Sequence, residues 1–300
     1  MSDFIQTIPT LRQVSNFKTK INFEGFNMSL IIHPENPNMY LATIRQADKF
    51  EGQYPEYYNR TFLLELSHDF QILSSEKLNE EPRETYRSYS IGVEDCRLIS
   101  DKFMTSVALD TNADWIPEMC FCEISREEGM IKNVKPLKYD TSEKTPEKNW
   151  LVLKYLEKQN VIHMLHSYDP IKVISVNLKE GHSQLISMKR IFKLTNCEVH
   201  GGACVYLPHL KQYLVIVRVI QEHKYIFSHW ILFNELYTYL GISPAFRFEP
   251  TNKKENYEMC MGLIYREEDN CLLSSVSIND KSVYIYGFNI NMILDEISDE

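Results

Sequence analysis

Short apolar or alternating stretches, bounded by Asn, Asp, Pro, Gly or charged residues, dominate the hydrophobic pattern of this chain. They are rich in Val, Ile, Tyr and Phe, which favour the pleated, half-buried surface of a β-sheet. The strands predicted from this pattern are Ser29–His33, Tyr40–Arg45, Phe62–Ser67, Phe103–Asp110, Met119–Ile124, Trp150–Tyr155, Val161–Tyr168, Lys172–Asn177, Tyr213–Ile220, Tyr225–Phe233, Cys271–Ser277 and Ser282–Ile290. Only Asn291–Ile297 is predicted as a short helix, and Asp48–Arg60 and Asp140–Lys148 as polar loops.

The predicted strands gather into groups of three or four that recur at a period typical of propeller blades. The groups lie near residues 28–72, 89–137, 149–194, 200–248 and 257–290. We therefore expect an all-β, five-bladed β-propeller that forms one domain over residues 1–300. An N-terminal extension of about 1–20 and a C-terminal tail of about 291–300 would flank it. A β-sandwich is the structural alternative, because short strands alone do not separate the two architectures.

Composition and charge narrow the range of partners. The 300 residues are 44% hydrophobic and 24% charged, which is ordinary globular composition. A net charge of −9 argues against binding nucleic acid or an anionic membrane surface, although it leaves room for a few cations around a small phosphate. No stretch approaches the ~18 apolar residues of a membrane span, and residues 1–20 do not resemble a signal peptide. The seven cysteines lack the spacing of a zinc site, so we expect free thiols and a cytoplasmic protein.

The strongest chemical signal is the segment Gly92-Val93-Glu94-Asp95-Cys96-Arg97-Leu98-Ile99. It resembles the Gly-x-Glu-Asp-Pro-Arg signature of glycoside hydrolase family 130, with Cys96 in place of the proline. That family contains β-mannoside phosphorylases and hydrolases, and it has transferase relatives that build β-mannans. Its fold is a five-bladed β-propeller, so the resemblance implies the same architecture as the strand groups.

Further elements extend the resemblance, in order, from about residue 27 to residue 290. They are Asn27–Ser29 with Tyr40–Arg45, Glu147–Trp150, His166–Pro170, His200–Gly202, Tyr225–His229, Ile242–Phe246, Gly262–Leu263 and Asn279–Asp280. Two of them depart from the pattern, since His200 replaces an arginine and the glycine expected before Asn279 is missing.

Breaking a glycosidic bond requires a proton donor near the leaving oxygen. The resemblance matches Asp95 to the family's catalytic aspartate, so we expect Asp95 to be the general acid, with a pKa raised by partial burial or by Glu94. Arg97 follows two residues later and would face the same way on an extended strand, where it would bind substrate or pin the carboxylate. The structural alternatives are a polar turn at Glu94–Arg97 and a salt bridge at Arg97.

A hydrolase that inverts configuration needs a second carboxylate, about 6.5–9.5 Å from the first, whereas in a phosphorylase inorganic phosphate is the attacking group. The candidates for that carboxylate are Asp169, Glu198, Glu258 and Asp280. Asp280 has the best position, because it corresponds to the closing aspartate of the resemblance.

The remaining candidates for substrate binding are cationic, aromatic or small. They are Arg45, Lys148, Asn149, Trp150, His200, Gly201, Tyr225 and His229, and Glu94 is a further binding candidate beside Asp95. Lys224 is another cation of this kind, but its position favours a solvated charge. Two or three cations would have to converge to bind a phosphate group. Trp150 would stack on a sugar or pack in the core, and Gly201 would let the backbone approach a ligand closely. No metal-ligand spacing and no glycine-rich phosphate loop is present, so we expect no cofactor, only phosphate or a nucleotide sugar as co-substrate.

Three functions are consistent with these features. The first is a phosphorylase or hydrolase acting on a β-mannoside-like oligosaccharide. The second is a glycosyltransferase that uses a nucleotide sugar or sugar phosphate on the same scaffold. The third is a propeller that binds a glycan or a protein without catalysis, which the departures from the family pattern favour and the retained Asp95 and Arg97 disfavour.

Overall fold

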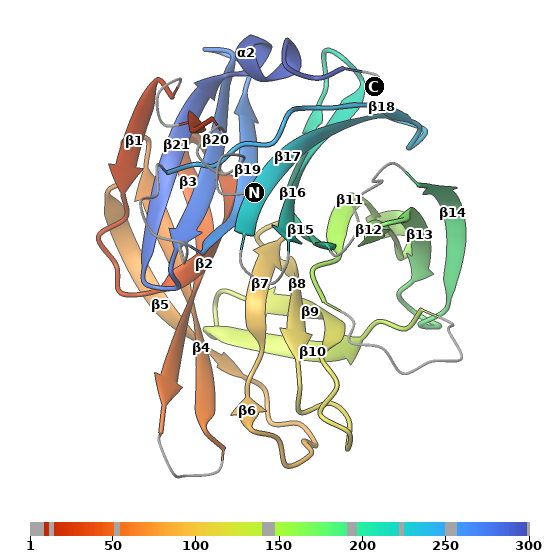
Figure 1. The fold of residues 1–300 in the computed structure, drawn as a ribbon. Helices are drawn as coiled ribbons and strands as arrows, with labels where there is room; N and C mark the ends of the chain where they lie inside the picture. Colours follow the sequence, from red (N-terminus) through yellow and green to blue (C-terminus); the bar gives the residue numbers. More distant parts are fainter. Residues whose placement is uncertain are drawn as a thin grey trace.

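The computed structural model describes residues 9–11, 15–50, 55–139, 148–190, 197–221, 225–249 and 257–298. Within them the chain is almost entirely β-strand, and the strands form five antiparallel blades (Figure 1). Blade I contains β2 (Phe26–His33), β3 (Asn36–Lys49), β4 (Tyr57–Ser67) and β5 (Ile72–Glu80). Blade II contains β7 (Glu94–Leu98), β8 (Phe103–Ala108), β9 (Glu118–Ser125) and β10 (Met130–Pro136). Blade III contains β11 (Leu151–Leu156), β12 (Val161–Tyr168), β13 (Ile171–Asn177) and β14 (Ser183–Lys189).

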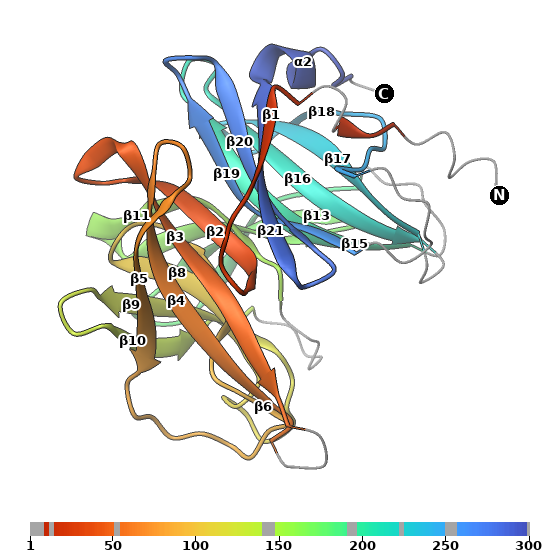
Figure 2. The same cartoon turned by 90° about the vertical axis from the view of Figure 1, so that its left-hand side faces the viewer.

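The last two blades bring the two ends of the chain together. Blade IV contains β15 (Cys197–Leu207), β16 (Gln212–Gln221), β17 (Tyr225–Asn234) and β18 (Tyr239–Ile242). Blade V contains β19 (Glu258–Arg266), β20 (Cys271–Ile278) and β21 (Ser282–Asn289), and β1 (Phe17–Lys20) is its fourth strand. The pairing of β1 with β21 closes the ring, as Figure 2 shows. The short β6 (Ser90–Ile91), a 3₁₀ turn (Glu157–Gln159) and helix α2 (Ile290–Leu294) complete the described elements.

The hydrophobic core is divided into five clusters, one in each gap between neighbouring blades. Strand β16 illustrates the cause: Val215 and Val217 pack against blade III, whereas Leu214 and Ile216 pack against blade V. A strand buried on both faces reads as a continuous apolar run, because alternate side chains enter two different cores. Five cores between five blades require a closed ring, so the fold is a five-bladed β-propeller and the sandwich alternative is excluded.

Blades I and II are joined more closely than the other neighbours. Their outer strands β5 and β10 pair in parallel, with Asn79 opposite Met130, so the two blades form one nine-stranded sheet. The β3–β4 hairpin of blade I runs past the body of the propeller, and β6 pairs with the start of β4, close to the tip of the hairpin (Figure 2).

The structure confirms the five strand groups and corrects some of their limits. Residues 17–20 belong to blade V rather than to an extension, and β3 and β4 occupy part of the predicted polar loop at 48–60. Loop 140–147 lies outside the described residues. The pattern missed β5 and β14 because these outer strands are largely exposed and polar, so they carry little apolar signal. It also missed the inner strands β7, β15 and β19 and the outer strands β10 and β18.

The structure also bears on the state of the cysteines and on membrane-spanning helices. All seven cysteines are free thiols in the structure, as expected. Among the described residues, no helix is long and apolar enough to cross a membrane.

Candidate functional site

Asp95 sits on a bulge in β7, the innermost strand of blade II. Glu94 pairs with Val107 and Arg97 with Thr105, so β7 holds one residue more than β8 across this interval. Asp95 itself has a left-handed backbone, with φ of 54°, which costs conformational energy in a residue other than glycine. The bulge interrupts the alternation of side chains on which the expected common direction of Asp95 and Arg97 was based, although the charge of Arg97 still lowers the pKa of Asp95.

Arg45 on β3 holds both acidic side chains of the bulge. Its Nη1 donates to Asp95 Oδ1 at 3.0 Å and its Nη2 to Glu94 Oε2 at 2.5 Å. Its Nε donates to the side chain of Asn59 on β4, at 2.9 Å. Asn27 on β2 donates a further bond to Asp95 Oδ1, at 2.7 Å. The predicted residues Arg45, Glu94 and Asp95 thus meet in one network, and Asn27 and Asn59 extend it.

The two neighbouring carboxyl groups titrate in opposite directions. Burial raises the pKa of Glu94 to about 7, and Asp95 adds to the effect while Arg45 opposes it. Burial would also raise the pKa of Asp95, but Arg45, the Asn27 hydrogen bond and Arg97 outweigh it and lower the pKa. The expected rise at Asp95 is therefore wrong for the free protein. The proton that the pair holds near neutral pH resides on Glu94.

Arg97 is buried, with 7% of its surface exposed, and crosses the axis of the propeller. Its Nη1 donates to the carbonyl of Gly202 on blade IV and lies 3.5 Å from the carbonyl of Met261 on blade V. Burial lowers the pKa of its guanidinium. Its Nη2 is buried and has no hydrogen-bond partner among the described residues. Arg97 therefore connects blades II, IV and V through hydrogen bonds to backbone carbonyls, rather than through the salt bridge that was the structural alternative. Its Nη2 remains available as a hydrogen-bond donor among the described residues.

Arg218 on β16 is a buried cation that the sequence analysis missed. It lies directly opposite His200 on β15, and its guanidinium is 4.5 Å from the centre of the Tyr257 ring. Two of its nitrogens, Nε and Nη1, are buried without a hydrogen-bond partner among the described residues. Its charge adds to the effect of burial in lowering the pKa of both Arg97 and His200. The sequence does mark this position, because Arg218 is a single charge within the apolar run of β16.

Asp280 lies in the turn between β20 and β21 and belongs to the same charged group. Its pKa is raised by desolvation and by the negative charge of Asp95, while Arg45 and Arg218 oppose the rise. Lys148 is exposed, and its positive charge reaches Glu94 and His200. Asp280 thus interacts electrostatically with Asp95, Lys148 with Glu94, and His200 with Lys148 and Arg218.

Gly201 does allow a close approach, but its neighbour is another part of the protein. A Cβ atom there would lie 1.9 Å from the hydroxyl of Tyr168 and 2.5 Å from the carbonyl of Asn149. The Tyr168 hydroxyl donates a hydrogen bond to this same carbonyl, at 2.5 Å. This contact holds blade III against blade IV beside Lys148 and His200. Gly201 and the backbone of Asn149 therefore have a structural role, instead of the predicted contact with a ligand.

Gly201→Ala is expected to destabilise the fold by about 2 kcal/mol or more, because the added methyl forces the buried Tyr168 hydroxyl away from its acceptor. Urea unfolding of both proteins would measure the loss. An unchanged free energy of unfolding in Gly201→Ala would contradict this role of Gly201.

Of the other predicted binding residues, Trp150 and His229 contact other parts of the protein. Lys224 and the side chain of Tyr225 lie outside the described structure. Trp150 is fully buried in the core between blades II and III, with its ring centre 4.6 Å from that of His166, so it packs in the core and does not stack on a sugar. His229 on β17 bonds to the carbonyl of Ser243 within blade IV, at 2.8 Å. The backbone of Tyr225 begins β17.

The other candidate carboxylates have local partners. Asp169 faces Arg190 at 3.8 Å, and Glu198 faces His200 at 3.3 Å. Glu258 is buried and accepts hydrogen bonds from the backbone of Phe248 and Glu249, each at 2.9 Å. Of the four candidates for a second carboxylate, Asp280 is the one whose charge interacts with Asp95.

Burial raises the pKa of Glu258 to about 7. The folded protein then binds more protons at this group than the unfolded chain, so its contribution is greatest below about pH 4.5 and is lost as the pH rises to about 7. The free energy of unfolding should fall by on the order of 3 kcal/mol across this window. Glu258→Gln should flatten the slope in urea titrations made at each pH, whereas Glu128→Gln, at an exposed carboxyl, should not. An unchanged slope in Glu258→Gln would contradict the assignment.

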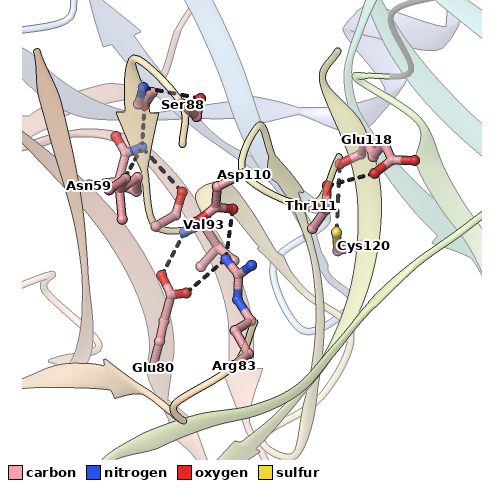
Figure 3. A network of polar contacts seen from close by, with 12 residues as sticks. Asn59, Glu80, Arg83, Ser88, Val93, Asp110, Thr111, Glu118 and Cys120 are labelled. Atoms are coloured by element: carbon pink, nitrogen blue, oxygen red, sulfur yellow. Dashed lines mark hydrogen bonds and ion pairs between the residues drawn. The ribbon is translucent and has the colours of Figure 1, made fainter. Parts of the chain in front are cut away.

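A second polar network supports the bulge from behind (Figure 3). Glu80 accepts a hydrogen bond from the backbone of Val93 at 2.6 Å, and Arg83 binds Glu80 at 3.2 Å and Asp110 at 2.8 Å. Asn59 adds contacts to the backbone of Ile91 and Gly92, each at 3.3 Å. The segment that carries Glu94 and Asp95 is thereby fixed from both sides. In the described part of the chain, no group of three His, Cys, Asp or Glu could hold a metal ion.

No protein-family model and no curated protein matches the chain. Several solved structures do have a similar fold. The β-1,2-mannobiose phosphorylase of Listeria innocua superposes with a TM-score of 0.66 at 14% identity, over 94% of this chain and 93% of that one. A structure described as a glycoside hydrolase of the GH130 mannoside phosphorylase family, acting on β-1,2 linkages in Candida mannan, has a TM-score of 0.63 at 12% identity, over 95% and 91%. A mannose phosphorylase from Leishmania mexicana, in complex with phosphate, has a TM-score of 0.55 at 9% identity, over 93% and 89%. Identities this low show a shared fold, the five-bladed β-propeller.

Proposed function

We propose that this protein is a glycoside phosphorylase that cleaves a β-mannoside-type oligosaccharide with inorganic phosphate. The observation that carries the proposal is the pair of buried guanidiniums, Arg97 and Arg218, whose charges interact and which keep three buried nitrogens without a hydrogen-bond partner among the described residues. Two buried like charges without a full set of acceptors are costly unless an anion binds between them. Phosphate matches them, because its oxygens accept several charge-assisted hydrogen bonds at once. His200 and Lys148 add donors at the same place.

Asp95 is the proposed general acid. A phosphate oxygen forms a bond to the anomeric carbon as the glycosidic C–O bond breaks, and the leaving oxygen takes the proton of Asp95. The products are a sugar 1-phosphate and a shortened saccharide. Asp95 must be protonated first, although Arg45 and Arg97 favour its ionised form. Phosphate bound to Arg97 would offset one of these charges, and the neighbouring Glu94 supplies a proton near neutral pH.

The sugar is inferred from the resemblance of the bulge segment and from the names of the structural neighbours. The β-1,2-mannobiose phosphorylase and the β-1,2-mannan hydrolase both act on β-1,2-linked mannose. None of the three superposed structures is named a glycosyltransferase, so that alternative gains no support. A cytoplasmic location, suggested by the sequence, remains a proposal.

A hydrolase is the second candidate, and Asp280 favours it. Its carboxyl interacts electrostatically with Asp95 and has a raised pKa, as expected of a group that activates water. Incubation with β-1,2-mannobiose, with and without phosphate, separates the two functions. A phosphorylase releases mannose 1-phosphate only when phosphate is present, whereas a hydrolase releases mannose at the same rate in both. No product from mannobiose or longer β-mannosides under either condition would favour the non-catalytic binding propeller.

A further inference from the structure

A cavity lies off the axis of the propeller, between blades I and II and behind the bulge. Its volume is about 570 Å³, which is in the range of small-molecule sites. Gly92 and Asn59 line its inner wall, and Phe50 and Tyr58 on the β3–β4 hairpin line another part. The cavity therefore reaches from the surface to the segment that carries Glu94 and Asp95.

Two groups on its wall have unused hydrogen-bonding capacity. The side chain of Asp110 is fully buried; its Oδ1 accepts from Arg83, and its Oδ2 has no partner in the described structure (Figure 3). Arg83 Nε is likewise buried and unbonded among the described residues. An unfilled donor and acceptor each cost free energy in the folded state. A hydroxyl group has the matching chemistry, because it can accept from a donor such as Nε and donate to an acceptor such as Oδ2.

The charges along the cavity are largely paired within the protein. Arg83 is neutralised by Glu80 and Asp110. Arg60 forms an ion pair with Asp48. The other two charged residues of the lining, Lys77 and Glu81, are exposed and opposite in sign. Charges of both signs therefore line the cavity, and the pairing of Arg83 with Asp110 favours a neutral ligand with hydroxyl groups.

The β3–β4 hairpin adds an exposed aromatic surface to the cavity. Phe50 and Tyr58 are 39% and 41% exposed, and their rings meet edge to face with centres 5.6 Å apart. Exposed aromatic faces beside hydroxyl-binding groups suit a molecule with one polar edge and one C–H-rich face. A pyranose ring has both.

We propose that this cavity is a second saccharide site, distinct from the axial site, which binds one or two neutral sugar units between Arg83–Asp110 and the Phe50–Tyr58 pair. The site is connected to the bulge, because Glu80 bonds both Arg83 and the backbone of Val93. The class of sugar is taken to be the same as for the proposed function, and the binding itself does not depend on catalysis.

Calorimetric titration of the Asp95→Asn protein with β-1,2-mannobiose tests the proposal without turnover. We expect saccharide binding that Tyr58→Ala weakens about tenfold, since a ring contact is worth roughly that much. Tyr206→Ala, which removes an exposed ring from blade IV, is the matched control and should leave binding unchanged. Asp110→Asn should weaken the same binding, and circular dichroism and thermal unfolding would show whether that variant still folds.

The outcomes separate this site from the axial one. A Tyr58-dependent binding step that persists in the presence of saturating inorganic phosphate supports the proposal, even if the protein proves to have no phosphorylase activity. Binding that Tyr58→Ala leaves unchanged overturns it. So does a crystal structure grown with mannobiose in which only water lies between Arg83 and Asp110, or one in which phosphate occupies the cavity.

Discussion

Asp95→Asn is expected to lower turnover of β-1,2-mannobiose by about 10²–10⁴, the usual contribution of general acid catalysis. The substitution keeps the size of the side chain and an oxygen that can accept from Asn27 and Arg45, so the bulge should retain its shape. Substrate binding should therefore be largely preserved. Initial rates at saturating substrate, together with calorimetric binding of the disaccharide, measure the two effects separately.

Two matched variants show whether the effect is specific to Asp95. Glu94→Gln removes the neighbouring proton reservoir, whose pKa is about 7, and should mainly change the pH profile of turnover near neutral pH. Asp280→Asn should abolish activity in a hydrolase that uses Asp280 as base, but should cost far less in a phosphorylase. Full turnover by Asp95→Asn would show that the assignment of the general acid is wrong and would move the binding propeller to first place.

Arg218→Gln is expected to raise the KM for inorganic phosphate by roughly 10–100-fold, the loss that follows from removing one charge-assisted contact. The KM for the disaccharide should change much less, because the three unbonded nitrogens of Arg97 and Arg218 are proposed to contact phosphate rather than sugar. Phosphate-dependent release of mannose 1-phosphate, measured over a range of phosphate concentrations, gives both constants. Arg218→Lys keeps the charge without the planar fork and should have an intermediate effect.

Arg126→Gln is the control for loss of an arginine elsewhere, since Arg126 pairs with Glu65 far from the axis. Thermal unfolding of both variants would reveal a general loss of stability. A phosphate KM that is the same in Arg218→Gln as in the wild type would argue against an anion site at this arginine. A wild-type rate that does not depend on phosphate would favour the hydrolase.

Part of the candidate site could be predicted because its residues are near one another in sequence or match a recognisable pattern. Glu94 and Asp95 were found together in one segment, and the positions of Arg45 and Asp280 in the ordered resemblance led to the same network. Arg218 was missed because it lies inside an apolar run, where a single charge has no neighbours in sequence to suggest a function. The role of Trp150 was left open, because a strand pattern does not show whether an aromatic ring is buried in the core or exposed to a ligand.

The all-β class, the five strand groups and the acidic segment at residues 92–99 could be predicted from the sequence, because they depend on local alternation, turn residues and short motifs. Which charges meet depends on the folded chain. Arg97 contacts carbonyls on blades IV and V, more than 100 residues away along the chain, and Gly201 faces Tyr168 of blade III. The pKa of Asp95 was likewise beyond the sequence, because it is set by the balance of burial against Arg45, Asn27 and Arg97. The physical reason is that ring closure brings the inner strands of separate blades to one axis, where low solvent access makes each charge depend on its neighbours.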